Sequence, residues 1–455
     1  MLNKDLWEKI EEFDLDHPLS EYDFTLRLAH ENYWTQTFTK QAVLEYKKFM
    51  FLAAVSDTMV SPSEIVDTVW HQQLIFTKSY SEFCRILGKQ IQHIPSTHNK
   101  EDFKKFKTAK EHTTKLYEAH FGEQPKSFWK YADQYESLHL KKSKFKLRTA
   151  IIIALLIFIV LIIPLYFLLK PIYLSIKNPD FIIFYSGLII ILLTGLEWYN
   201  RKKLNHVIHS FDKDSFIFDL QPFELIYLKN MNISSIISGT VNELIDNSYL
   251  KINADKTLSI NNLSFAKSRE ERQIVDTLED LGKASYRNLL NQLIVKPVFS
   301  NIVKSMDAVK KYFIRSKIFS DLFVLNMVLF LFLIMFGLLR MITGILREKP
   351  VLQISFAVAI LLFLMIGYLF RLTHKFSSKV LPDTYKKVVL SKRNAENDWQ
   401  WSYFLLGPAV FTTSFIAISG QPISDGSGGS SEGSTSSDSS CGGSSCSSCG
   451  GCGGD

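Results

Sequence analysis

The sequence lacks the motifs that mark the best-known enzyme classes. It contains no glycine-rich phosphate loop, no Ser-His-Asp set with a nucleophile elbow, and no paired-carboxylate motif. Nucleotide binding through a P-loop and triad-type acyl transfer therefore have no support from the sequence. The opening segment MLNKDLWEKIEEFDLDHP has neither an apolar core nor a cleavage site, so we expect no signal peptide.

Charge is also sparse, at 21% of 455 residues, whereas 47% of the residues are hydrophobic. The apolar residues gather in four uncharged runs, and a helix needs about 20 such residues to cross a bilayer. The four runs are Thr149–Leu169, Phe181–Leu196, Leu322–Leu339 and Val351–Phe370. The sequence therefore predicts an integral membrane protein with two transmembrane hairpins, residues 149–199 and 320–371.

Basic residues indicate how these hairpins are oriented. Lysine and arginine cluster before the first and third runs and after the second and fourth, and are fewer in the two short connections. The positive-inside rule then places the N-terminus and the central soluble region in the cytoplasm, with the bilayer of an inner or cell membrane as a partner. The same clustering accounts for the formal charge of +7 without nucleic-acid binding.

A fifth apolar segment, residues 401–420, is ambiguous because it contains Gly407-Pro408 and several hydroxyl groups. If it spans the membrane, the C-terminal tail lies outside the cytoplasm. If it lies in the interface, the tail stays inside. The sequence favours four spans.

The chain is expected to be mainly α-helical, beginning with a helical cytoplasmic domain over residues 1–140. Helical periodicity is clear after Thr39, which we expect to cap a helix. In SPSEIVDTVWHQQLIFTKSYSEFC, we expect Ser61 to be the N-cap, Pro62 the first helical residue, and Glu64 part of a capping box. Gly88 and Gly122 are natural helix ends.

The same stretch holds the candidate site residues. Asp67 and His71 are one helical turn apart, so a carboxylate could hold one imidazole nitrogen, and His93 follows just after the helix end. A His pair with an orienting Asp can bind a metal or move a proton, with Cys84 as a further candidate ligand. The alternative is that His71 is an interior residue packed beside Trp70, and the residues alone favour this packing interpretation.

These motifs resemble the N-terminal domain of the glycine-rich domain-containing protein family, known from plants and bacteria. The matching positions are Val66, Asp67, Trp70, His71, Tyr80, Phe83, Cys84, Gly88, His93, Pro95, Phe121, Gly122, Glu123, Pro125 and Trp129. The family often has a second His two residues after the first, where this chain has Gln73, and that departure weakens the metal interpretation. The resemblance covers about the first 135 residues and implies interaction and regulation rather than a settled activity.

Residues 210–318 are expected to form a second cytoplasmic unit. The sequence predicts two helices followed by two short strands flanking a polar turn, the outline of a small winged-helix-like module. Nucleic-acid binding would need a basic recognition helix, and SSIISGTVNELIDNS contains no Lys or Arg. We therefore expect this module to contact protein or to be purely structural.

Residues 421–455 form a Gly/Ser/Cys-rich tail whose composition predicts a flexible coil. Cys441, Cys446, Cys449 and Cys452 could chelate zinc or an iron–sulfur cluster, although the tail offers no structured surroundings, which favours free thiols. Together with PFELIYL at 222–228, the tail resembles an uncharacterised family of bacterial membrane proteins. That family usually has a glycine before the helix-turn element, which KNMNISSI at 229–236 lacks.

Three function classes follow from the sequence. The favoured one is a membrane-anchored interaction or scaffold protein with an unknown protein partner, no catalytic residues and no required cofactor. The second is a metal-binding protein or metal-dependent enzyme centred on His71 and His93, with zinc as the candidate ion. Transport is least favoured, because the apolar runs have no ionisable residue in their interiors and no internal repeat is visible.

Overall fold

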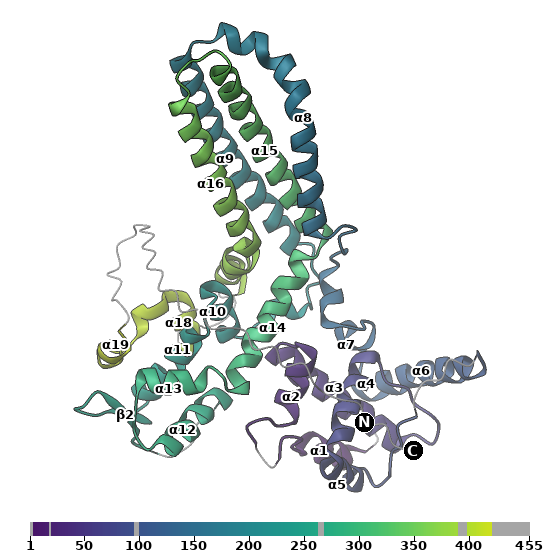
Figure 1. The fold of residues 1–455 in the computed structure, drawn as a ribbon. Helices are drawn as coiled ribbons and strands as arrows, with labels where there is room; N and C mark the ends of the chain where they lie inside the picture. Colours follow the sequence, from purple (N-terminus) through teal and green to yellow (C-terminus); the bar gives the residue numbers. More distant parts are fainter. Residues whose placement is uncertain (1–2, 18–19, 95–99, 263–267, 390–397, 421–455) are drawn as a thin grey trace, which may run out of the picture.

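A computed structural model describes all of the chain except residues 1–2, 18–19, 95–99, 263–267, 390–397 and 421–455. The described part is mainly helical. Four long helices stand together as a bundle, and shorter helices form a broad base at one end of it (Figure 1). The base combines the N-terminal helices with the central part of the chain.

The long helices are α8 (Leu147–Ser175), α9 (Asn178–Ile208), α15 (Lys317–Ile345) and α16 (Leu352–Lys375). All four are long and apolar enough to cross a membrane, which confirms the predicted hairpins at this level. Each helix also includes polar residues that flank its apolar run, so it is longer than the run itself. Within the most apolar stretch, 61% of α15 is buried against the other helices but none of α8 is.

Polar side chains also join the bundle. Asn200 on α9 and Asn326 on α15 are fully buried and exchange side-chain hydrogen bonds of 2.8 and 3.0 Å. Asn200 also donates to the hydroxyl of Tyr368 on α16, at 3.1 Å. Amide pairs of this kind stabilise helix association in apolar surroundings because neither group can turn to water. Three helices are thereby held in register near the base.

The N-terminal helices surround α3 (Gln36–Val55), whose Tyr46, Phe49 and Phe51 are buried. Around it lie α1 (Lys4–Glu12), α2 (Phe24–Asn32), α4 (Glu64–Ile75), α5 (Thr77–Leu87), α6 (Lys100–Phe121), α7 (Lys126–Trp129) and the 3₁₀ turn η1 (Gln134–Leu138). The helical character predicted for residues 1–140 is confirmed for the described residues.

The helix starts differ from those predicted. The N-cap of α4 is Ser63, whose hydroxyl accepts from the amide of Val66 at 3.2 Å, and not Ser61. Ser61 instead donates its amide to Thr113 on α6, which holds it in the preceding loop. Likewise α3 begins after Thr35, and Thr39 lies one turn inside the helix. Local sequence offered several hydroxyl caps in a row, and packing against neighbouring helices selected between them.

The long helix expected after Ser61 is broken into α4 and α5 at Phe76, which has non-helical torsion angles. Both predicted glycine ends are confirmed. Gly88 and Gly122 have positive φ angles of 69° and 84°, a conformation that L side chains rarely adopt.

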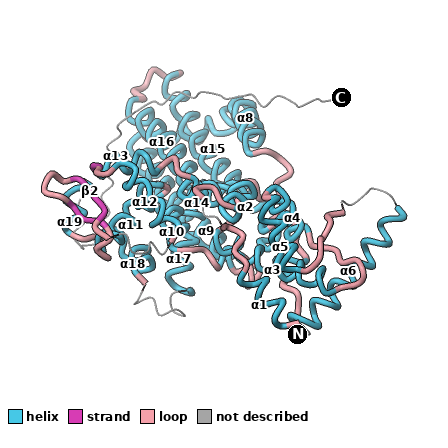
Figure 2. The backbone as a smooth tube through the Cα atoms, turned by 90° about the horizontal axis from the view of Figure 1, so that it is seen from below, coloured by secondary structure: helices cyan, strands magenta, loops and turns pink. Residues whose placement is uncertain are grey.

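The central unit contains the predicted helix pair and strand pair, and one more strand. Its elements are η2 (Phe216–Phe218), α10 (Pro222–Asn230), α11 (Ile233–Asp246), β1 (Leu250–Ile252), β2 (Thr257–Ile260), α12 (Arg269–Leu281), β3 (Ala284–Ser285), α13 (Tyr286–Leu293) and α14 (Pro297–Ile314). The sheet is antiparallel in the order β1-β2-β3, with Lys251 opposite Ser259 and Leu258 opposite Ala284. It lies at the periphery of the base, away from the bundle (Figure 2). The α14 helix leads directly into α15.

The ambiguous fifth apolar segment is bent. It forms α18 (Trp399–Leu406), the 3₁₀ turn η7 (Gly407–Val410) and α19 (Thr413–Ser419), with a bend of 66° between the two helical parts. Buried Trp401, Phe404 and Phe415 pack it into the core that contains α10 and α11. Before it, α16 continues through the π-helical η3 (Phe376–Val380), α17 (Leu381–Thr384) and π-helical η4 (Tyr385–Val389).

The N-terminal helices and the central unit, predicted from the sequence as separate domains, share one continuous hydrophobic core. Figure 2 shows α2 lying beside α14. Polar groups cross the same boundary: Arg269 of α12 pairs with Asp16 and with Asp23, the latter at 3.3 Å. Because the core is common to both parts, residues 1–140 lose part of their packing when they are cut from the chain.

Glu224 on α10 is a fully buried carboxylate at this boundary. It accepts hydrogen bonds from the backbone amides of Gln36, at 2.9 Å, and Gln221, at 2.7 Å. Burial raises the pKa of Glu224 from 4.5 to about 7, and the nearby Glu270 adds to the rise. The folded chain therefore holds a proton at pH values where the unfolded chain has lost it.

This proton predicts a pH dependence of stability. As the pH rises from about 4.5 to about 7, Glu224 should cost the folded state about 3 kcal/mol, because a raised carboxyl pKa stabilises the fold only where the group is protonated. Glu224→Gln has no titrating group at this position, so its free energy of unfolding should not show this pH-dependent loss. The stability of the variant relative to the wild type should therefore increase as the pH rises. Thermal unfolding of the full chain across this range measures the difference. The exposed Glu279→Gln is the control, and parallel curves for Glu224→Gln and wild type would contradict the prediction.

Candidate metal site

The candidate site begins on α4. The Ser63 cap starts this helix so that Asp67 and His71 lie one turn apart on its outer face. The Oδ2 atom of Asp67 is 3.4 Å from Nε2 of His71. The predicted proximity of these two residues is confirmed, because positions i and i+4 of a helix are neighbours on its surface.

His93 reaches the same carboxylate from the loop that follows α5. Its Nε2 lies 2.9 Å from Oδ1 of Asp67, and its ring centre is 4.4 Å from that of His71. One ligand atom from each of the three residues can be chosen so that all lie within 4.8 Å of one another. Both imidazoles therefore present the same nitrogen to one carboxylate, from two different elements of the fold.

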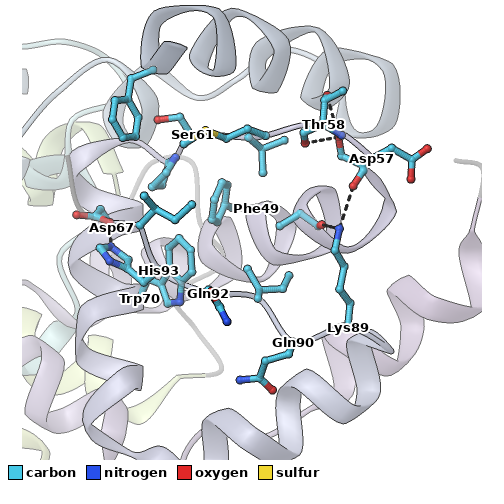
Figure 3. Close-up of a pocket in the computed structure, with 18 residues that line it drawn as sticks. Phe49, Asp57, Thr58, Ser61, Asp67, Trp70, Lys89, Gln90, Gln92 and His93 are labelled. Carbon is cyan, nitrogen blue, oxygen red and sulfur yellow. Dashed lines mark hydrogen bonds and ion pairs between the residues drawn. The ribbon is translucent and has the colours of Figure 1, made fainter. Parts of the chain in front are cut away.

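Trp70 and Tyr80 position the His93 loop. The indole Nε1 of Trp70 donates to the Tyr80 hydroxyl at 3.2 Å, and this hydroxyl donates to the backbone carbonyl of Ile91. The Trp70 ring also meets the His93 ring in a T-shaped contact at 4.6 Å, visible in Figure 3. Burial raises the pKa of Tyr80 to about 12, so its hydroxyl remains a donor at neutral pH.

The site opens on a pocket of about 380 Å³. Figure 3 shows Asp67, Trp70 and His93 together on one wall and Lys89 at the far side. Lys89 donates to the carbonyls of Ala53, at 3.3 Å, and Ser56, at 3.1 Å, at the end of α3. Much of the remaining wall is the loop of residues 56–62. From the sequence, Ser61 and Pro62 signal only a helix start, because this loop becomes part of the site only through folding.

His71 is not an interior residue, so the favoured packing interpretation is wrong for this side chain. Its side chain is 58% exposed, whereas Trp70 is 5% exposed. Successive residues on a helix point about 100° apart, so Trp70 can face the core while His71 faces solvent. The side chain of His93 is the more enclosed of the two imidazoles, at 15% exposed.

The structure also revises the roles expected for Cys84 and for position 73. Cys84 is buried in the core of the N-terminal helices and is not one of the three residues whose ligand atoms converge. Gln73 is also fully buried, and its Oε1 accepts from the Tyr46 hydroxyl on α3. A histidine at position 73 would point into this core and could not join His71, so its absence does not weaken the site.

The four tail cysteines proposed as ligands lie outside the described residues: Cys441, Cys446, Cys449 and Cys452. Their predicted role as metal ligands therefore stays a prediction.

The donor set fits a divalent transition metal. Two imidazole nitrogens and one carboxylate are borderline ligands of the kind zinc accepts, with bonds of about 2.0–2.2 Å. In a tetrahedral site with such bonds, ligand atoms lie about 3.4 Å apart. The two separations from Asp67 involve different oxygens: Oδ2 lies 3.4 Å from His71 and Oδ1 lies 2.9 Å from His93. One ligand atom from each of the three residues can be chosen so that all lie within 4.8 Å of one another, so the tetrahedral spacing falls inside the range that the residues span. Three protein ligands leave a fourth position open, and it would be reached from the pocket.

The chain is therefore a helical protein of a defined class. Its base carries the Asp67, His71 and His93 cluster and is joined to four helices that could span a membrane. A family model described as UCP032817-like, an uncharacterised family, matches residues 9–115, and this range includes Asp67, His71 and His93. No curated protein and no solved structure matched the chain. The family match carries no activity with it, so only the geometry of the site bears on function.

Proposed function

We propose that this chain is a membrane-anchored metalloprotein that binds one divalent ion, of the zinc class, through Asp67, His71 and His93. The observation that carries the proposal is the convergence of their ligand atoms within 4.8 Å at the edge of a pocket. A purely structural zinc site normally has four protein ligands. Three ligands beside an open pocket favour a site where the metal takes water or a small ligand with a lone pair.

The pocket supports this assignment. Asp67, Trp70 and His93 belong to its wall, so a ligand bound to the metal would lie against the 56–62 loop. Lys89, at the far side, would favour a ligand whose distal group is negative or accepts hydrogen bonds. The chemistry that the metal would supply is polarisation of that ligand or lowering of the pKa of bound water.

The proposal also includes the location of the base, the fold of the central unit and the two family resemblances. The clusters of Lys and Arg beside the long helices support a cytoplasmic base, by the positive-inside rule. The helix pair and strand pair of the central unit support the winged-helix-like assignment, and the motifs around His71 support kinship with the glycine-rich domain-containing family. The Cys/Gly-rich tail supports the second resemblance, to a bacterial membrane-protein family.

The alternative is the interaction or scaffold function that the sequence favours. One observation supports it: Phe103 on α6 is 71% exposed, one turn before Phe106, which lines the pocket. Exposed aromatic side chains beside a pocket are typical of surfaces that bind a protein partner. In this case Asp67 would orient the two imidazoles for hydrogen bonding to that partner.

Metal content separates the two functions. The full chain is purified in detergent with its four tail cysteines changed to serine, incubated with Zn²⁺, desalted and analysed by mass spectrometry. We expect one metal ion per chain, and a loss of affinity on the order of a hundredfold or more in His71→Ala and in His93→Ala, since changes to outer-shell partners alone cost about 10- to 100-fold.

The matched control is His112→Ala. His112 lies on α6 and contacts the same loop, with Nε2 2.7 Å from the Thr58 hydroxyl, but it is not in the three-residue cluster. It should keep its metal. A wild-type chain without metal, or metal retained equally in His71→Ala and His93→Ala, would overturn the metalloprotein assignment in favour of the interaction function.

A further inference from the structure

A long apolar groove runs between α8 and α15, which lie side by side in the bundle (Figure 1). Its volume is about 800 Å³. Its walls are aliphatic and aromatic over most of their length, and include Ala154, Phe158 and Leu161 from α8 and Val328, Leu331 and Phe332 from α15.

The groove is long enough to hold a lipid chain. On α8 it extends from Ala150 to Leu165, which at 1.5 Å per residue is about 22 Å. One leaflet of a bilayer is about 15 Å deep in hydrocarbon. No residue in the most apolar stretch of α8 is buried by the rest of the described chain, so this wall is open to acyl chains.

The base end of the groove is closed by two chain segments that pair with each other. Lys142 and Ser316 form an antiparallel β-bridge. The amide of Ser143 donates to the carbonyl of Arg315 at 3.0 Å, and the amide of Lys317 donates to the carbonyl of Lys141 at 2.7 Å. We call residues 141–144 and 315–317 the basic strap.

The strap concentrates positive charge at the mouth of the groove. Lys144 and Lys317 line the groove itself, and all five strap cations are exposed: Lys141, Lys142, Lys144, Arg315 and Lys317. Asp321 is the acidic residue in the groove lining. Among the described residues no ion pair engages the strap cations. The local charge is therefore positive by several units.

We propose that the groove and the basic strap form a binding site for an anionic glycerophospholipid. One acyl chain lies along α8 and α15, and the phosphate headgroup lies against Lys144 and Lys317. Basic residues beside membrane helices also serve topology, but topology requires no particular arrangement. Here backbone pairing brings cations from positions more than 170 residues apart to one end of one groove, which is the arrangement that headgroup recognition needs.

The test uses the full chain in nanodiscs of equal phosphatidylglycerol and phosphatidylcholine, with retained lipids identified by native mass spectrometry. The wild type should retain phosphatidylglycerol in preference to phosphatidylcholine. Because each cation near a membrane surface contributes to anionic lipid binding, Lys144→Gln/Lys317→Gln should lower this preference on the order of tenfold. Ala154→Trp, which fills the groove, should reduce retention of both lipids.

The matched control is Lys202→Gln/Lys203→Gln, which removes two exposed cations at the base end of α9, outside the groove, and should leave the preference unchanged. An arm with added inorganic phosphate distinguishes a lipid from a soluble anion. Full displacement of phosphatidylglycerol by phosphate would assign the strap to a soluble anion and overturn the lipid site. Unchanged preference in the Lys144/Lys317 variant, or unchanged retention in Ala154→Trp, would also overturn it.

Discussion

Replacing Glu45 with alanine is expected to destabilise the N-terminal helices by about 3–5 kcal/mol, the cost of breaking a buried charged network. Glu45 lies on α3 and is 3% exposed. Its Oε2 accepts from the Tyr117 hydroxyl at 2.8 Å and from the Trp129 indole at 2.7 Å, and its Oε1 accepts from Lys48 at 2.7 Å. The carboxylate thus connects α3 with α6 and α7.

Alanine would leave the Tyr117 hydroxyl and the Trp129 indole without this acceptor inside the fold, which is why the expected loss is large. Lys48 would keep its contact with the Tyr117 hydroxyl, at 3.1 Å. Burial, and then the Glu45 carboxylate, raise the pKa of Tyr117 well above its usual range, so its hydroxyl remains a donor at all ordinary pH values. Glu45→Gln keeps one acceptor oxygen and should cost less than Glu45→Ala. Urea unfolding of the full chain in detergent, followed by tryptophan fluorescence, measures both.

The control is Glu8→Ala on α1. Glu8 also pairs with a lysine, Lys4, but its side chain is 56% exposed. Exposed pairs of this type contribute about 0–1 kcal/mol. If Glu45→Ala lowered stability no more than Glu8→Ala, the network would not be the link between these helices.

Gly337→Leu is expected to disrupt the four-helix bundle. A Cβ atom at Gly337 on α15 would lie 2.5 Å from the Tyr185 hydroxyl on α9 and 2.6 Å from Cγ2 of Val358 on α16. Tyr185 cannot easily move, because its ring is buried and its hydroxyl donates to the carbonyl of Leu333 at 3.0 Å. Glycine allows three helices to meet closely here, as small residues do in membrane helix packing.

Overpacking of a close-packed core costs about 1–3 kcal/mol, and a whole leucine side chain at a three-helix contact should reach or exceed the upper end. Thermal stability and monodispersity of the detergent-solubilised chain measure this. Gly187→Leu on α9 is the matched control, because a Cβ there meets no described atom within 4 Å and leucine raises helix propensity equally at both positions. Similar behaviour of the two variants would contradict the packing argument.

Part of the candidate site was predictable from the sequence. Asp67 and His71 are four residues apart on an amphipathic helix, and helical geometry alone makes them neighbours. The contact of His93 with Asp67 was only a possibility, because it depends on how the loop after Gly88 returns across Trp70. The exposure of His71 was predicted wrongly, because the buried Trp70 beside it suggested a shared environment that adjacent helix positions do not have.

The four helices that could span a membrane were predictable at the level of existence and type. Their apolar length exceeds what buried soluble helices use, and this property needs no knowledge of the fold. Their neighbours were not predictable. The central place of α15, the Asn200–Asn326 pair and the open groove beside α8 arise from which faces pack together, and a helix apolar on all sides does not reveal which face is covered.

By itself, the sequence determined that this protein is mainly helical, that four helices could span a membrane, and that a carboxylate and a histidine share one helical turn. Those properties depend on residues close together along the chain. Only the tertiary structure decided that His93 completes the cluster, that Cys84 and Gln73 do not, that the N-terminal and central units share one core, and that Lys144 and Lys317 meet at one groove. Each of these depends on contacts between distant segments, which side-chain packing selects and local sequence does not encode.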